Sequence, residues 1–91
     1  MSDIRSERAV WMRPADDAIL EFMRDRRAEY PAIVANRIGM HAPYVEDRFE
    51  RLAEFGLLES VTDEVVYRIT ADGECYLDGT LDPLSLQSRR S

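Results

Sequence analysis

The stretch VANRIGMHAPYVEDRF, Val34 to Phe49, decides the fold of this chain of 91 residues. It places a small residue, a glycine and a later apolar residue at the spacing of a helix-turn-helix, namely Ala35, Gly39 and Val45. The small residue lets two helices cross closely, the glycine suits a turn with positive φ, and the apolar residue anchors the second helix of the motif. The remaining inward positions are expected to hold Val34, Ile38, Met40, Phe49, Leu52 and Leu57.

The segments on both sides of this motif predict the other elements. Pro14 followed by two aspartates predicts a first helix from about Ala15 to Arg27, with Arg24, Arg26 and Arg27 in its last turn. The second helix is predicted at 31–38 and the third at 44–55, ended by Gly56. The runs GLLESV and VVYRIT flank a short turn, Thr62-Asp63-Glu64, and predict a β-hairpin. Thr70 caps a last helix, ADGECYLDG, which offers Tyr76 and Leu77 to the core.

This order predicts a mainly α fold with a small β-hairpin. The expected fold is a winged helix-turn-helix, in which a three-helix bundle is followed by a wing and a C-terminal helix. We divide the chain into an N-terminal arm (1–13), the winged domain (14–80) and a polar C-terminal tail (81–91). No targeting signal and no run long enough to cross a bilayer is present in the sequence, so we expect a cytoplasmic protein with no membrane partner.

The charged residues bear on the salt concentration at which the protein works. The chain has 18 acidic and 12 basic residues, a net charge of −6, and every basic residue is arginine. A GC-rich genome can produce this bias by chance, but an acidic, lysine-free surface is also typical of a cytoplasm at molar salt, which we favour. At such salt the screening length is only about 3 Å, so the negative charge argues weakly against DNA binding.

These residues resemble a known family. The segments ERAVWM.PADDAILEF, IVANRIGMH..YVEDR...LAEFGLLE and YRIT.DG..YLDGTLD, within 7–82, are similar to small winged-helix regulators of haloarchaea, which are grouped with a haloarchaeal phage repressor and are broadly MarR-like. The resemblance implies a transcriptional regulator that places its third helix in the major groove of double-stranded DNA, commonly as a dimer. The chain departs from the family pattern at Ala42 and Pro43, where basic or amide residues are usual, and in its acidic wing turn.

Helical geometry sorts the residues of the third helix. With Val45 facing the core, Phe49 and Leu52 also face inward. Arg48 lies at the core edge, where we expect it to pair with an acid. The outward positions are Pro43, Asp47, Glu50 and Glu54, with Tyr44 and Arg51 on one flank and Glu46 on the other.

Five residues are candidate DNA contacts. They are Arg37, His41, Tyr44, Arg51 and Arg68. For His41 the alternative is a turn residue that caps or packs, and for Tyr44 it is packing against the wing. For Arg51 the alternative is an ion pair with Glu54 or Asp47.

The N-terminal arm and the single cysteine each allow two interpretations. Val10, Trp11 and Met12 either join the core or bind a second copy of the chain. Three adjacent apolar residues cannot all face one way, so we predict a homodimer formed by the arm and the last helix. Cys75 excludes an internal disulfide, and we expect a buried thiol rather than a redox sensor.

The sequence also bears on two other classes of function. An acidic outward face on the third helix suits a protein partner, so a winged helix that docks a protein and no longer reads DNA is the alternative. An enzyme is not expected, because one His and one Cys supply neither a catalytic grouping nor a metal site. No cofactor is expected either.

Overall fold

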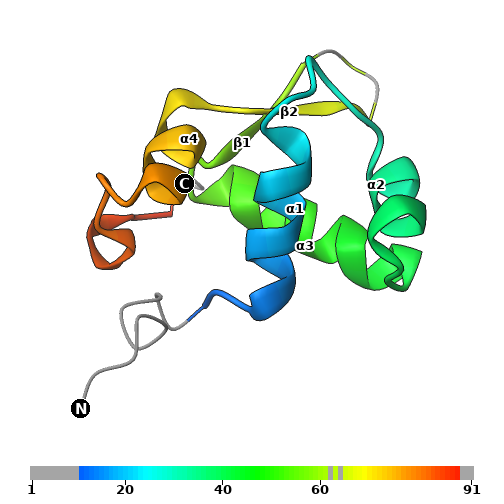
Figure 1. Cartoon of the computed structure of the whole chain (residues 1–91), viewed down its shortest axis with the longest axis horizontal. Coiled ribbons are helices and arrows are strands. Elements are labelled where there is room, and N and C mark those ends of the chain that lie inside the picture. Colours follow the sequence, from blue (N-terminus) through cyan, green and yellow to red (C-terminus); the bar gives the residue numbers. More distant parts are fainter. Residues whose placement is uncertain (1–10, 62, 64, 89–91) are drawn as a thin grey trace.

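A computed structural model describes residues 11–61, 63 and 65–88. The elements follow in the predicted order: α1 (Pro14–Met23), α2 (Pro31–Ile38), α3 (Ala42–Glu54), β1 (Leu58–Ser60), β2 (Tyr67–Ile69) and α4 (Ala71–Asp78). A single turn of 3₁₀ helix follows at Pro83–Ser85. Figure 1 shows α1 crossing α3, with α2 and α4 on opposite sides of α1 and the hairpin across one end. The predicted winged helix-turn-helix is confirmed.

The helix-turn-helix forms as its sequence predicts. α2 ends at Gly39, whose φ of 74° is in the left-handed region, and the Met40 N–H closes the turn on the carbonyl of Ala35 at 2.9 Å. Ala35 is 1% exposed and Val45 is fully buried, so α2 and α3 pack closely. Met40 was predicted to face inward, which is wrong: it is 36% exposed.

α1 is shorter than predicted, because it ends at Met23 and not near Arg27. Beyond Met23 the chain must extend to reach the wing, where the backbone of Glu29 exchanges two hydrogen bonds with Tyr67, at 2.9 and 3.0 Å. The arginines placed in the last turn of this helix therefore lie outside it. Arg24 pairs instead with Asp78 of α4, and Arg26 lies over the ring of Phe22.

The wing is a two-stranded antiparallel sheet. Leu58 faces Ile69, Glu59 faces Arg68 and Ser60 faces Tyr67. Since Glu29 bonds to the other edge of β2, the strand is flanked on both sides at Tyr67. The Tyr67 ring meets Phe49 edge to face at 5.2 Å and so joins the wing to α3.

The core lies where α1, α2, α3 and the wing meet. Its central apolar side chains come from the helices, from the first residue of β1 and from the residue before it: Ile19, Leu20, Met23, Val34, Ala35, Val45, Phe49, Leu52, Leu57 and Leu58. The predicted contributions of Tyr76 and Leu77 are confirmed, because both pack against this cluster while partly buried.

α4 is fixed by its first turn. Thr70 caps the helix by accepting from the Gly73 N–H at 3.0 Å, and its hydroxyl donates to the Gly56 carbonyl at 2.6 Å. Gly73 leaves no room for a side chain, since a Cβ would lie 2.3 Å from the carbonyl oxygen of Leu57. Tyr76 donates to the carboxylate of Asp17 at 2.6 Å and so joins α4 to α1.

The segment after α4, predicted as a polar tail, folds back on the domain. Leu86 packs against the core cluster, and the hydroxyl of Ser88 donates to Glu54 at the end of α3 at 2.6 Å. Among the described residues, no helix is long and apolar enough to cross a membrane.

Candidate nucleic-acid interface

α3 presents one buried face and one exposed face. Val45, Phe49 and Leu52 are fully buried, as predicted from the helical period. The exposed residues of the helix are Pro43, Tyr44, Glu46, Asp47, Glu50 and Arg51. Pro43 is accommodated at the second position of the helix, where backbone N–H groups have no partner within the helix.

Three of the five predicted DNA contacts lie around the turn between α2 and α3. Arg37 is exposed in the last turn of α2, and Tyr44 is 41% exposed on the first turn of α3. His41 occupies the N-cap position of α3, but its imidazole is exposed and makes no capping hydrogen bond. All three side chains therefore point to solvent, where a ligand can reach them.

The other two predicted contacts form ion pairs on the protein surface. The Arg51 guanidinium lies 3.3 Å from the carboxylate of Glu54, which is the i,i+3 pair expected from the sequence. Arg68 pairs across the wing with Glu59 at 2.5 Å. Glu54 was predicted to point outward, and this is wrong: its side chain is only 11% exposed, beneath Ser88.

Arg48 is held inside the protein by a carboxylate, as its place at the core edge predicted. Its guanidinium donates twice to Asp16, at 2.8 Å each, and once to the Trp11 carbonyl, also at 2.8 Å. Asp16 is fully buried and also accepts the Arg13 N–H at 2.9 Å. The hydrogen bonds to Asp16 raise the pKa of Arg48 above its ordinary value.

Sequence reasoning assigned Asp16 to the helix dipole and missed its burial. A signal was present, because Asp16, Leu20 and Met23 are spaced i, i+4 and i+7 and share one face of α1. An acid on an apolar stripe, with one arginine at a core edge elsewhere, predicts such a pair.

The arm packs on its own chain. Trp11 stacks on Phe55 with ring centroids 4.2 Å apart and ring planes 12° apart, and Met12 is 4% exposed in the core. The Trp11 indole Nε1 is buried and has no hydrogen-bond partner within the described part of the chain. Val10 lies outside the described residues. Of the three predicted dimer contacts, Trp11 therefore keeps a partly exposed ring, whereas Met12 has little surface left.

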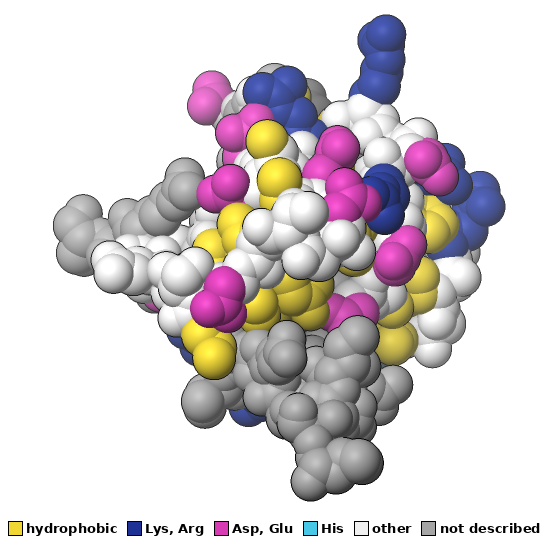
Figure 2. Space-filling view, turned by 60° about the vertical axis from the view of Figure 1, so that its left-hand side comes forward, with side chains coloured by type: hydrophobic (Ala, Val, Ile, Leu, Met, Phe, Trp, Pro, Cys, Tyr) yellow, Lys and Arg dark blue, Asp and Glu magenta, His cyan; other side chains and the backbone are white. Residues whose placement is uncertain are grey.

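Within the described residues, neither the acidic side chains nor Cys75 forms a second candidate site. Acidic side chains are spread over the face shown in Figure 2 rather than gathered at one edge. In the described ranges, no group of three His, Cys, Asp or Glu residues is arranged to hold a metal ion. Cys75 is a free thiol, and the prediction that it is buried is wrong because it is only half-buried.

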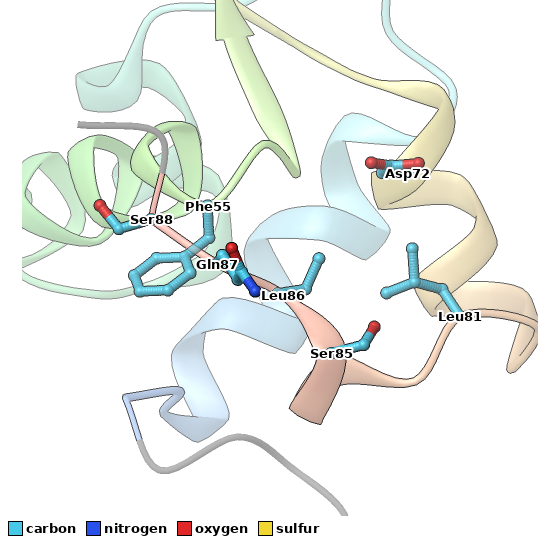
Figure 3. Close-up of a pocket in the computed structure, with 7 residues that line it drawn as sticks. All are labelled: Phe55, Asp72, Leu81, Ser85, Leu86, Gln87 and Ser88. Atoms are coloured by element: carbon cyan, nitrogen blue, oxygen red, sulfur yellow. The ribbon is translucent and has the colours of Figure 1, made fainter. Parts of the chain in front are cut away.

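An open hollow of about 420 Å³ lies between the end of α3, the start of α4 and the C-terminal segment. Figure 3 shows its lining residues: Phe55, Asp72, Leu81, Ser85, Leu86, Gln87 and Ser88. Its lining mixes polar and apolar side chains, and the Ser88 hydroxyl is already bonded to Glu54.

Comparisons with known proteins agree with this geometry. Residues 5–89 match the family described as winged helix-turn-helix phage repressor. The crystal structure of the PhiH1 repressor-like protein from Haloarcula marismortui superposes with a TM-score of 0.79 at 30% identity, covering 89% of this chain and 93% of that one.

Two more distant structures share the fold. A MarR family protein from Bacillus stearothermophilus gives a TM-score of 0.66 at 21% identity, over 76% of this chain and 51% of that one. The reduced form of MarR from E. coli gives 0.67 at 14% identity, over 84% and 56%. A comparison with curated proteins finds no match.

Proposed function

Because the chain belongs to the winged helix-turn-helix phage repressor family, we propose that it is a transcriptional regulator that binds double-stranded DNA with α3 in the major groove. The family is one of DNA-binding proteins and not of enzymes. The observation that carries the proposal is the helix-turn-helix, in which α2 supports α3 through Ala35 and Val45 and leaves the opposite face of α3 exposed. A major groove about 12 Å wide admits such a helix.

The proposed contacts follow from exposure. His41 and Tyr44 at the start of α3 contact the bases or the adjacent backbone, and Arg37 at the end of α2 binds a phosphate. Arg51 and Arg68 reach DNA only by leaving their carboxylate partners, so they contribute less.

The protein works at high salt in this proposal. Supporting observations are the 18 acidic residues, the absence of lysine and the similarity to a haloarchaeal protein. Exposed Glu46, Asp47 and Glu50 repel phosphates strongly in dilute buffer, but at molar salt screening within about 3 Å removes most of that repulsion. The same conditions place the regulator in the cytoplasm of a salt-adapted cell.

Two copies act together in this proposal, because helix-turn-helix dimers read two half-sites one helical turn apart. The contact is formed by the arm, which includes the partly exposed Trp11, and by α4, where Cys75, Tyr76 and Leu77 are only half-buried. Sedimentation in molar potassium chloride is expected to give twice the chain mass of 10.5 kDa. A monomer at micromolar concentration that still binds one DNA site per chain contradicts the dimer.

Fluorescence anisotropy tests the proposed function. Duplexes covering the DNA upstream of the chain's own gene are titrated in molar potassium chloride with the wild type, with the Tyr44→Ala/Arg51→Ala double variant, and with Arg27→Ala as a control exposed outside α3. We expect saturable binding that prefers one duplex, survives in the control and fails in the double variant. Folded protein that shows no preference at any salt excludes sequence-specific DNA binding.

One observation favours the alternative function. Glu46, Asp47 and Glu50 form no hydrogen bond or ion pair with any residue that the structure describes, and such a face suits a basic protein partner. Charge reversal distinguishes the two functions, since Glu46→Arg with Glu50→Arg strengthens DNA binding but abolishes binding to a basic protein.

A further inference from the structure

The N-terminal half of α3 carries an unusual set of side chains for reading base pairs. Arg bonded to the O6 and N7 acceptors of guanine is the commonest specific contact between proteins and DNA. Between Ile38 and Glu50 this chain has one arginine, Arg48. That guanidinium is turned inward, with two bonds to Asp16 and one to the Trp11 carbonyl, and its side chain is 11% exposed.

Arg48 is therefore not available to guanine. To reach a base it must abandon the fully buried carboxylate of Asp16, which leaves an unpaired charge in the core. The next arginine along the helix, Arg51, lies in the last turn and pairs with Glu54, whereas base contacts come mainly from the N-terminal residues of a recognition helix.

Apolar side chains are exposed at the start of α3, where no arginine is available to contact a base. Pro43 is exposed on the first turn of α3, Tyr44 is 41% exposed beside it, and Met40 is 36% exposed in the preceding turn. The apolar group that base pairs present in the major groove is the C5 methyl of thymine.

The carboxylate next to this surface accepts hydrogen bonds and donates none. Asp47 lies one turn after Pro43 on the same outward face, is exposed, and has no hydrogen bond or ion pair to a described residue. An aspartate accepts from the N4 amino group of cytosine, and it repels the acceptors that guanine presents.

We infer that α3 reads pyrimidines on one strand, with Pro43 and Tyr44 on thymine methyl groups and Asp47 on a cytosine amino group. The inference rests on the proposed DNA binding and names the bases that the same face recognises.

Selection of DNA sequences, followed by removal of single thymine methyl groups, tests this inference. Duplexes randomised over about 20 base pairs, two helical turns, are selected with the full chain in molar potassium chloride. We expect thymine and cytosine to be enriched together in each half-site. Replacing the enriched thymines one at a time by deoxyuridine removes only the methyl group, and at the contacted position affinity is expected to fall about fourfold, as for the burial of one methyl group.

Two variants assign the contacts to residues. Tyr44→Ala is expected to bind the thymine and deoxyuridine duplexes equally, while Leu84→Ala, which removes an exposed apolar side chain far along the chain, keeps the fourfold difference. Asp47→Asn is expected to shift the preferred base from cytosine to adenine by about tenfold, because asparagine pairs with adenine. Asp25→Asn is the exposed control outside α3 and is expected to leave the preference unchanged.

The outcomes separate this inference from the proposed function. A selected half-site that has no thymine and cytosine together on one strand, or deoxyuridine duplexes that bind as well as thymine ones, overturns the base assignment and leaves the regulator intact. A pool that shows no enrichment with folded protein, in dilute or molar salt, overturns both.

Discussion

The Arg48→Met substitution tests whether the buried ion pair holds α3 in place. It removes both Arg48 bonds to a fully buried carboxylate, although Asp16 keeps the bond from the Arg13 N–H. Breaking a buried pair costs about 3–5 kcal/mol, and the remaining bond places this site near the lower end, at about 3 kcal/mol. A small domain has a free energy of unfolding of about 5–15 kcal/mol, so the variant still folds.

Urea unfolding followed by helix circular dichroism measures this loss in dilute and in molar potassium chloride. The loss is expected to be similar at both salts, because ions do not screen a pair with a side chain that is fully buried. Arg51→Met is the matched control: its pair with Glu54 has a half-exposed guanidinium, so the loss stays below about 1 kcal/mol and shrinks with salt.

A second substitution isolates the charge. Adding Asp16→Asn to Arg48→Met removes the stranded carboxylate charge, so the double variant is expected to be more stable than Arg48→Met alone. An Arg48→Met loss below about 1 kcal/mol, or a loss that disappears in molar salt, contradicts the reasoning and means that the pair is solvated.

Three further substitutions probe the wing and α4. Gly73→Ala forces a Cβ against the Leu57 carbonyl and is expected to lower the free energy of unfolding in urea by about 3 kcal/mol. In the control Gly79→Ala the Cβ meets no atom, but φ is 80°, so the expected loss is only about 1–2 kcal/mol. Equal losses in the two variants refute the steric argument. Thr70→Val removes the cap of α4 and the hydrogen bond to Gly56, so the free energy of unfolding in urea is expected to fall by about 1–2 kcal/mol. Thr80→Val, at an exposed position, is the control. Burial raises the pKa of the Tyr67 phenol, so the unfolded chain ionises first and stability falls as the pH rises through about 10. Tyr67→Phe is expected to flatten that fall, and a variant with the same pH profile as the wild type refutes the assignment.

Local patterns in the sequence predicted the helix-turn-helix closely. The bounds of α2 and the left-handed turn at Gly39 follow from signals within a few residues, as does the buried stripe of α3. The hairpin and the cap at Thr70 belong to the same class of local signal.

Contacts between distant segments were not predictable in the same way. The early end of α1 depends on Glu29 bonding to Tyr67, 38 positions later, and a single bridge leaves no periodic pattern. The packing of the C-terminal segment depends on Leu86 and Ser88 meeting surfaces that only the folded chain creates.

The candidate site was predicted in part. Exposure of Arg37, His41 and Tyr44 follows from helix geometry, and so does the inward position of Arg48. The identity of its partner did not follow, because pairing of Asp16 with Arg48 joins two helices 32 positions apart.

The bridge at Glu29 has a consequence for aggregation. An unpaired strand edge is a template on which another chain can add a strand, and proteins often block such edges with charge. At molar salt repulsion between copies is screened within about 3 Å, so charge alone protects poorly. Here the backbone of Glu29 occupies the outer edge of β2 at Tyr67, and the remaining edge, β1, is only three residues long. The wing is thus protected from intermolecular strand addition by a backbone bridge within the chain and by the shortness of β1, neither of which depends on repulsion between charges.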